Sequence, residues 1–191
     1  MNPIELFKIW FLQQIENTEV KIPGACCLST VGLDGFPNAR FVSLKEITDE
    51  GFIITGTLTS RKGSEIRQSN NVALTFWWAE TERQVRIQGE AAVISEELAD
   101  RYFAERSREI QIVSIVSEQG QEINSIETLN KNYRDIEALF SNQPLTRPDN
   151  WGGYYISPIR MEFMEFNSSR FHHRILYELN DKKWVFKQLQ P

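Results

Sequence analysis

The alternation of apolar and polar residues divides much of the chain into short strands. Apolar or β-branched runs at residues 25–31, 39–44 and 51–57 predict three strands, and the Asp34-Gly35 turn between the first two predicts a hairpin. Residues 72–78 are almost continuously apolar, which predicts a strand buried on both faces. Further strands are predicted at the end of the chain, over residues 154–157, 161–166, 175–179 and 184–189.

Residues 83–94 alternate more regularly than the other predicted strands. Val85 and Ile87 fall on one face, and Gln84 and Arg86 fall on the other. The polar face either meets water or lines a polar ligand site, and the pattern alone favours water. Trp77 and Trp78, in the strand before, are most simply interpreted as core residues.

Helical spacing appears in the segments between these strands. Residues 4–15 form an amphipathic stretch that is too short to span a bilayer and lacks a signal-peptide flank, so we expect a helix that packs on the body of the protein. Ser95 is the predicted cap of a helix over residues 95–106, and an Asn-x-x-Glu pattern starts a helix over residues 124–140. Shorter helices are predicted over residues 109–116 and directly after Ser60, whose side chain is the candidate cap of the second one.

Short antiparallel strands with a few helices predict a β-rich α+β fold, a β-barrel with flanking helices. The chain of 191 residues is long enough for one domain, and we expect residues 1–191 to form it, with a helix in residues 1–20 packed on the barrel.

Composition narrows the possible functions only slightly. The 21 basic and 26 acidic residues give a net charge of −5, which argues weakly against a nucleic-acid-binding surface. The only cysteines, Cys26 and Cys27, are adjacent, and no Cys/His spacing predicts a metal site, so a reducing, cytoplasmic setting without a metal fits best. The chain contains no GxSxG, GxGxxG or P-loop motif.

Three basic clusters are the candidate chemistry. Arg61 and Lys62 follow Ser60 at the start of a predicted helix, where free N–H groups and the helix dipole also favour an anion, and phosphate is the obvious one. A solvated surface turn is the alternative. The other clusters are Arg40 with Lys45, and residues 170–174.

In the last of these clusters Arg170, His172 and Arg174 alternate, so an extended chain would point them one way. A solvent-facing edge strand is the alternative interpretation. Tyr102 and Arg106 are spaced by four residues, which places them on one helix face.

Several motifs occur together in a specific order. They are NARFVSLK, TSRKGSEI, FWW followed by RQVRIQGEA, RYFAERS, IVSEQG, WGGYYISPIRMEF, RFHHRI and the closing LQP. From about Pro37 to the C-terminus this order resembles the pyridoxamine 5'-phosphate oxidase family. The resemblance implies an FMN-binding split β-barrel that forms a homodimer with the flavin at the subunit interface.

The resemblance also implies a reaction. Pyridoxine 5'-phosphate or pyridoxamine 5'-phosphate is oxidised to pyridoxal 5'-phosphate by hydride transfer from C4' to flavin N5. Dioxygen then reoxidises the flavin and yields hydrogen peroxide, and the amine substrate also releases ammonia. In such a mechanism the flavin supplies the redox chemistry, and the protein supplies orientation and charge.

The roles implied by the resemblance fall on individual positions. The residues matching the FMN contacts are Arg40, Phe41, Val42, Ser43, Leu44, Lys45, Thr55, Gly56, Arg61, Lys62, Gln84, Gln119, Gly120, Met164 and Arg174. The residues matching the substrate contacts are Lys45, Tyr102, Arg106, Ile110, Arg170 and His172. Arg170 and His172 match the catalytic pair that closes over the pyridine ring. Because Gln84 matches a flavin contact, the resemblance implies that the polar face of its strand lines a ligand site and does not simply meet water.

The chain departs from the family pattern at four positions. Ile110 stands where a serine usually contacts the substrate phosphate, Gly120 replaces a serine, Met164 replaces a tryptophan and His173 replaces an aspartate. Ile110 cannot donate a hydrogen bond, so weaker substrate affinity is expected.

These departures keep two alternatives open. One is a related FMN oxidase or reductase that acts on another aromatic substrate, as in phenazine biosynthesis, and the other is an FMN-binding protein without turnover. The presence of all the other matched substrate contacts favours the phosphorylated B6 vitamer.

Overall fold

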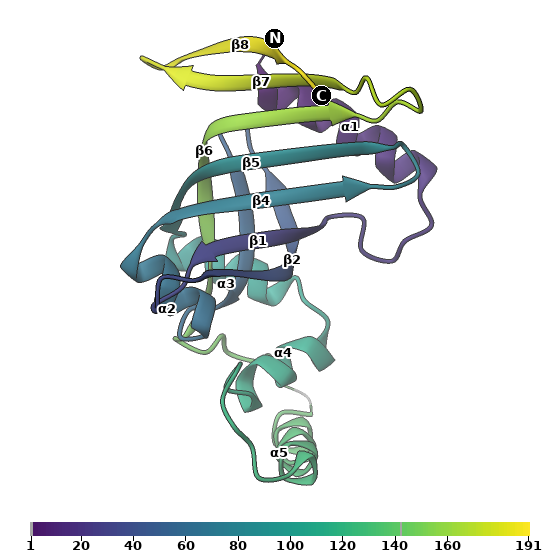
Figure 1. The fold of residues 1–191 in the computed structure, drawn as a ribbon. Helices are drawn as coiled ribbons and strands as arrows, with labels where there is room; N and C mark the ends of the chain where they lie inside the picture. The colour runs from purple at the N-terminus through teal and green to yellow at the C-terminus, as the bar shows by residue number, and fades with distance from the viewer. Residues whose placement is uncertain (1, 142) are drawn as a thin grey trace.

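The computed structural model describes residues 2–141 and 143–191, and its eight strands form one antiparallel sheet (Figure 1). The strand order is β3-β2-β1-β4-β5-β6-β7-β8, and an additional pairing of β3 with β6 closes the strands from β1 to β6 into a barrel. The predicted β-barrel with flanking helices is therefore confirmed. The strands are β1 (Ala25–Val31), β2 (Pro37–Ile47), β3 (Phe52–Thr57), β4 (Asn71–Trp78), β5 (Arg83–Val93), β6 (Trp151–Glu165), β7 (His173–Asn180) and β8 (Lys183–Leu189).

The longest strand, β6, joins the barrel to the extension made by β7 and β8. Its first residues pair with β3, its last residues pair with β7, and β5 lies along its other edge. The prediction of two separate strands in this region is wrong, because the ladder continues past Pro158 through an irregularity opposite Gly89. A Cβ atom on Gly89 would lie 2.3 Å from the carbonyl oxygen of Ser157, so only glycine allows this close approach.

The helix α1 (Pro3–Asn17) covers the apolar interior of the barrel. It begins after Asn2, whose side chain accepts a hydrogen bond from the amide of Ile4. Phe7 is fully buried and meets the rings of Phe52 and Phe76 edge-on, each at 4.9 Å between centroids. The start of α1 and the end of the chain both lie at the top of Figure 1.

The other helices gather at the opposite end of the barrel, below β1 and β2 in Figure 1. They are α2 (Arg61–Gln68), α3 (Glu96–Ala104), α4 (Arg108–Val116) and α5 (Ile126–Leu139). Ser95 caps α3 as predicted, whereas α5 is capped by Ser125 and not by Asn124. Ser60 precedes α2, but its hydroxyl donates to the carbonyl of Thr57, so the predicted cap bond is not made.

The strand β4 is buried on one face only. Val72, Leu74, Phe76 and Trp78 point into the core, whereas 54% of Trp77 is exposed. The prediction that both faces are buried is therefore wrong, as is the interpretation of Trp77 as a core residue. In a closed antiparallel barrel one face of each strand points outward, and apolar residues on that face lie at the surface. Among the described residues, no helix is long and apolar enough to cross a membrane.

Candidate functional site

A cavity of about 320 Å³ lies where β2, the end of β3 and the region of α4 meet the start of α2. It brings together predicted site residues from five separate parts of the sequence. These are Phe41, Val42, Thr55, Gly56, Lys62, Arg106 and Gln119.

Lys62 is a buried cation at the edge of this cavity. Its Nζ atom donates to Gln119 Oε1 at 2.8 Å and to Ser60 Oγ at 3.0 Å, both of which are neutral. Burial lowers the pKa of Lys62 to about 8, and the nearby charge of Arg40 adds to the effect. A Cβ atom on Gly56 would lie 3.3 Å from Nζ, so the glycine leaves the space beside the ammonium open.

Arg106 is a second cation in the same cavity. Its guanidinium carbon lies 4.9 Å from the centre of the Trp151 ring, and its Nη1 atom donates to Ser114 Oγ at 2.9 Å. Burial lowers the pKa of Arg106. Within the described ranges, neither Arg106 nor Lys62 has a carboxylate oxygen within 4.0 Å. Two partly desolvated cations without a counter-anion favour a bound anion such as a phosphate.

Arg40 and Arg61 are held differently, by the buried carboxylate of Glu65 on α2. Glu65 Oε2 accepts from Arg40 at 2.7 Å, and Oε1 accepts from Arg61 at 2.9 Å. Burial opposes ionisation of Glu65, yet the hydrogen bonds from Thr30, Asn38, Arg61 and Arg40 together lower its pKa to about 2. Arg61 and Lys62 are therefore not an equivalent pair, because only the charge of Arg61 is already compensated.

The strand β2 presents its predicted contact residues on two faces. Arg40, Val42 and Leu44 are partly buried, whereas Phe41, Ser43 and Lys45 alternate with them and are exposed. Lys45 forms an ion pair with Glu105 at 2.6 Å. The two faces of β2 therefore present different side chains, and Phe41 and Val42, one from each face, both border the cavity.

Tyr102 lies next to Lys45, whose Nζ atom is 5.1 Å from the centre of the tyrosine ring. Tyr102 is buried, and its hydroxyl donates to Glu46 at 2.6 Å. The helix α3 ends at Ala104, so Arg106 lies beyond it and does not share a helix face with Tyr102 as predicted. Ile110 lies on α4 and is 47% exposed.

Gln84, Met164 and Arg174 form a second cluster of predicted residues. The strand register places Gln84 opposite Met164 and Met164 opposite Arg174, across β5, β6 and β7. Arg174 is oriented by Glu162, whose Oε1 atom accepts two of its hydrogen bonds at 2.8 and 3.0 Å. The polar face of β5 therefore continues across neighbouring strands on the outside of the barrel.

Arg170 and His172 lie in the loop before β7 and not in an extended strand, so the prediction of alternating side chains is wrong for them. Arg170 has a φ of 67°, in the left-handed region that non-glycine residues rarely adopt. His172 Nδ1 accepts a hydrogen bond of 3.0 Å from the amide of Asn167, which leaves the ring proton on Nε2. The loop thus holds a cation and an imidazole N–H beside the second cluster. The interpretation of β7 as an edge strand is also wrong, because β8 is the edge.

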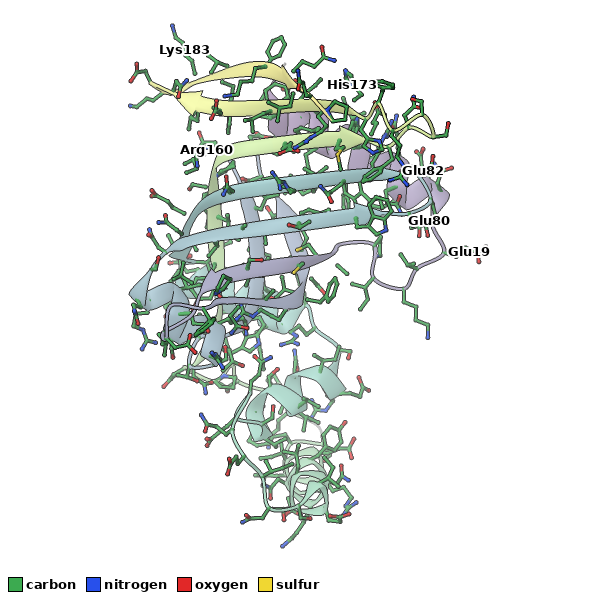
Figure 2. The ribbon with its side chains drawn as sticks, viewed as in Figure 1. Glu19, Glu80, Glu82, Arg160, His173 and Lys183 are labelled. Atoms are coloured by element: carbon green, nitrogen blue, oxygen red, sulfur yellow. The ribbon has the colours of Figure 1, made fainter. Side chains whose placement is uncertain are left out.

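The two sets of predicted residues do not meet within one chain. The cavity is lined by residues of α2 and α4, and Figure 1 shows these helices at one end of the barrel. The second cluster lies at the other side, where Glu82 and His173 are labelled in Figure 2. One chain therefore contains two incomplete parts of the predicted site.

Gly120 follows Gln119 in a left-handed conformation, with a φ of 88°, and leaves its surroundings open.

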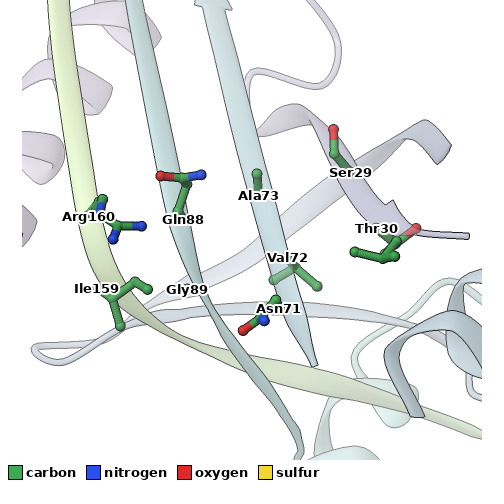
Figure 3. Close-up of a pocket in the computed structure, with 10 residues that line it drawn as sticks. Ser29, Thr30, Asn71, Val72, Ala73, Gln88, Gly89, Ile159 and Arg160 are labelled. Carbon is green, nitrogen blue, oxygen red and sulfur yellow. The ribbon is translucent and has the colours of Figure 1, made fainter. Parts of the chain in front are cut away.

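A second hollow, of about 360 Å³, lies on the outer face of β1, β4, β5 and β6 (Figure 3). Gln88 and Arg160 point toward it from neighbouring strands, and Arg160 is already paired with Glu178 at 3.6 Å. None of the predicted site residues lines it. Across residues 2–141 and 143–191, no group of three His, Cys, Asp or Glu side chains could hold a metal ion.

Sequence reasoning missed Glu65, Glu162 and Ser114, which hold predicted site residues. Glu65 is four residues after Arg61, a spacing that indicates an ion pair on a helix. No comparable signal connects Glu162 to Arg174 or Ser114 to Arg106, since these contacts depend on strand register and on the path of the link between α3 and α4.

Comparison with known proteins identifies two family models along the chain. Residues 14–140 match the model described as "Pyridoxamine 5'-phosphate oxidase". Residues 151–191 match the model described as "Pyridoxine 5'-phosphate oxidase C-terminal dimerisation region". This second region contains β6, β7, β8 and the loop with Arg170 and His172.

Individual relatives cover the whole chain. A protein from Acaryochloris marina named pyridoxine/pyridoxamine 5'-phosphate oxidase is 40% identical over 190 residues, spanning 100% of this chain and 86% of that protein. The crystal structure of PhzG from Burkholderia lata, in complex with tetrahydrophenazine-1-carboxylic acid, is 33% identical with a TM-score of 0.93 and covers 100% of this chain and 93% of that one. An FMN-binding protein from Nostoc punctiforme has a TM-score of 0.82 at 16% identity, covering 100% and 99% of the two chains, and shows the fold alone.

Proposed function

This chain belongs to the pyridoxamine 5'-phosphate oxidase family, and from that premise we propose that it oxidises pyridoxine or pyridoxamine 5'-phosphate to pyridoxal 5'-phosphate. The acceptor is dioxygen and the by-product is hydrogen peroxide. The observation that carries the proposal is the pair of cations, Lys62 and Arg106, which share one cavity and have no carboxylate partner among the described residues. The reaction requires two phosphate-bearing molecules, the cofactor and the substrate, and each needs such a cation.

The cofactor of this family is FMN, and the residues present fit it. Lys62 is buried and, in the described part of the chain, has no carboxylate partner. Gly56 leaves room beside it, and Gln119 is within hydrogen-bond reach. Lys62 binds the FMN phosphate as the uncompensated charge, and Arg61 adds directional donors while Glu65 holds it in place. When bound, FMN supplies the redox chemistry by accepting a hydride from the substrate and passing its electrons to dioxygen.

The substrate is held by residues of both clusters. Arg106, which lines the cavity, binds its phosphate together with Lys45 and Tyr102, which lie beside each other. Arg170 supplies positive charge at the pyridine ring, and His172 supplies a neutral Nε2–H donor, because its Nδ1 is already used by Asn167. These groups orient the ring and stabilise charge on it.

The complete site requires two chains. The dimerisation region matched by residues 151–191 includes Met164, Arg170, His172 and Arg174. We place this part of one chain against the cavity of its partner, so that a homodimer has two composite sites. Phe41 and Phe171 are 80% and 78% exposed in one chain, and apolar surface of this kind is expected to be covered in an assembly.

A second candidate function is the oxidation of a different aromatic substrate. The 33% identity to PhzG, whose structure holds tetrahydrophenazine-1-carboxylic acid, supports it. Ile110 also supports it, because an apolar side chain replaces a hydroxyl donor expected at the substrate phosphate. A substrate with a carboxylate would need less charge and fewer donors than a phosphate.

The deciding experiment follows the flavin absorbance without oxygen. The protein is loaded with FMN and mixed anaerobically with pyridoxine 5'-phosphate, and separately with pyridoxamine 5'-phosphate. Bleaching of the flavin, with colour restored by air and pyridoxal 5'-phosphate formed, is the expected result. A flavin that binds but stays oxidised with both compounds would reject the proposed substrate, and dihydroaromatic carboxylic acids would be tested next.

A further inference from the structure

Arg106 has a hydroxyl neighbour that no comparison assigns. Ser114 lies on α4, one helical turn after Ile110, and borders the same cavity as Arg106. Its Oγ atom accepts the 2.9 Å hydrogen bond from Arg106 Nη1. The same oxygen donates to the carbonyl of Ile110 at 3.0 Å.

The hydrogen bonds of Ser114 determine what it can do. A hydroxyl has one hydrogen to donate and two lone pairs that accept. The hydrogen goes to the Ile110 carbonyl, so the oxygen is oriented as an acceptor and meets the guanidinium. Ser114 therefore cannot donate to a bound anion without breaking its helical bond, but it can fix the direction of the Arg106 side chain.

Arg106 needs such a partner because its other contacts do not fix its donors. The contact with the Trp151 ring has no directional donor, so it does not determine where the N–H groups of Arg106 point. Among the described residues, Ser114 is the only side-chain hydrogen-bond partner of the guanidinium, and this bond sets its direction. A guanidinium has five N–H groups, so the remaining ones stay available for a dianion.

We propose that Ser114 is a positioning residue that orients Arg106 toward the phosphate of the substrate. The inference rests on the proposed function for the identity of the substrate, although the anion contact itself can be measured without turnover. This role would also compensate for Ile110, which cannot donate a hydrogen bond to the phosphate, because a well-oriented arginine takes the place of that second donor.

Ser114 could also serve only the helix, through its hydrogen bond to the backbone carbonyl of Ile110. Serines within helices often donate to the carbonyl four residues earlier, and Ser117 does so with Val113. Ser117 borders the same cavity, but its only hydrogen bond in the structure is to the backbone. It is therefore a matched control, with the same residue type, the same backbone contact and no bond to Arg106.

The experiment compares Ser114→Ala, Ser114→Thr and Ser117→Ala in the FMN-loaded protein. Each is titrated with inorganic phosphate by calorimetry, and then KM and kcat are measured with pyridoxine 5'-phosphate. For Ser114→Ala we expect phosphate affinity to fall and KM to rise about tenfold, as for the loss of a hydrogen bond to a charged group, with little change in kcat. Threonine keeps the hydroxyl and should restore both values. Ser117→Ala should lose less phosphate affinity than Ser114→Ala, because Ser117 has no bond to Arg106.

A double variant tests whether Ser114 acts through Arg106. In the Arg106→Ala background, Ser114→Ala should cause no further loss of phosphate affinity. Unchanged phosphate binding in Ser114→Ala, or an additional loss in the double variant, would overturn the inference. Alanine favours helices, so unfolding of α4 is not expected to confuse the result. If the protein does not oxidise pyridoxine 5'-phosphate, the phosphate titration still decides the role of Ser114, and only the proposed function fails.

Discussion

Glu65 Oε2 lies 2.7 Å from a guanidinium nitrogen of Arg40, although the Glu65 side chain is completely buried. The same carboxylate holds Arg61, so one acidic residue orients two arginines that the family resemblance assigns to FMN. It also ties α2 to β1 through Thr30 and to β2 through Asn38. Glu65 thus connects the stability of the barrel end to the geometry of the cofactor site.

Replacing this carboxylate should destabilise the protein. Glu65→Gln leaves two arginines facing a neutral amide, and breaking a buried ion pair costs about 3–5 kcal/mol. We expect the free energy of unfolding at pH 7, measured by urea denaturation, to fall by that order. Glu50→Gln removes an exposed carboxylate and serves as the control. A loss equal to that of the control would contradict the structural role of Glu65.

The same residue predicts a sensitivity to acid. Its pKa is lowered from an ordinary value of 4.5 to about 2 in the folded protein. The folded state therefore binds the Glu65 proton later than the unfolded state, and the stabilisation is present above pH 4.5 and lost as the pH falls toward 2. The difference in unfolding free energy between the unsubstituted protein and Glu65→Gln should shrink over that interval. A constant difference would indicate that Glu65 does not titrate as described.

Single substitutions should separate Arg61 from Lys62. Lys62 is buried and has no carboxylate partner in the described part of the chain, whereas Arg61 is 63% exposed and paired with Glu65. We expect Lys62→Ala to be purified nearly colourless and Arg61→Ala to retain part of its flavin. The ratio of bound flavin to protein, from absorbance, measures both. Full flavin content in Lys62→Ala, or in a variant with both Arg61→Ala and Lys62→Ala, would contradict the proposed phosphate contact.

Flavin affinity should also depend on pH. Burial, with help from Arg40, lowers the pKa of Lys62 to about 8 without a ligand, and a bound phosphate dianion raises it again. Binding above pH 8 must therefore take up a proton, so the Kd for FMN should be flat below pH 8 and rise about tenfold per pH unit above it. Fluorescence titration measures this, and Lys62→Arg, which keeps its charge, should flatten the profile. The pH values 7 and 9.5 lie roughly one unit or more on either side of the pKa of Lys62. A Kd for FMN that is the same at both values would contradict the proposed contact between Lys62 and the phosphate.

The composite site predicts complementation between two inactive chains. Lys62→Ala should lose flavin, and Arg170→Ala should keep flavin and lose most turnover. In a mixed dimer, one of the two sites combines the intact Lys62 of one chain with the intact Arg170 of the other, so random mixing should restore about a quarter of the activity. Co-expression with two different affinity tags isolates the mixed dimer. If it stays inactive, both clusters serve the same chain and the composite arrangement is wrong.

Local patterns were sufficient for the barrel but not for the long strand. The alternation along β5 and the Asp34-Gly35 turn are properties of neighbouring residues, and both predicted their elements. Pro158 interrupts such a pattern, so β6 was divided into two strands. Its continuity depends on Gly89 of the neighbouring strand, which allows the backbones to approach closely.

The site was less predictable for the same reason. The resemblance named Lys62 and Arg106, and the structure brings both to one cavity. The spacing of Arg61 and Glu65 indicates their ion pair, but it could not show that the same carboxylate also holds Arg40, because three partners of Glu65 come from β1 and β2. The alternation of Arg170, His172 and Arg174 was interpreted for an extended chain, but the positive φ of Arg170 places it in a turn that a period-two pattern does not distinguish.

The length of β6 has a consequence for the proposed dimer. Gly152 and Gly153 pair with β3 beside one cavity, and Met164 lies near the other end of the same strand in the cluster proposed for the partner's site. In the proposed homodimer, each centre would therefore contain residues from both copies of β6. Because one continuous strand reaches both centres, we expect a substitution near Pro158, in the middle of β6, to perturb the two centres together.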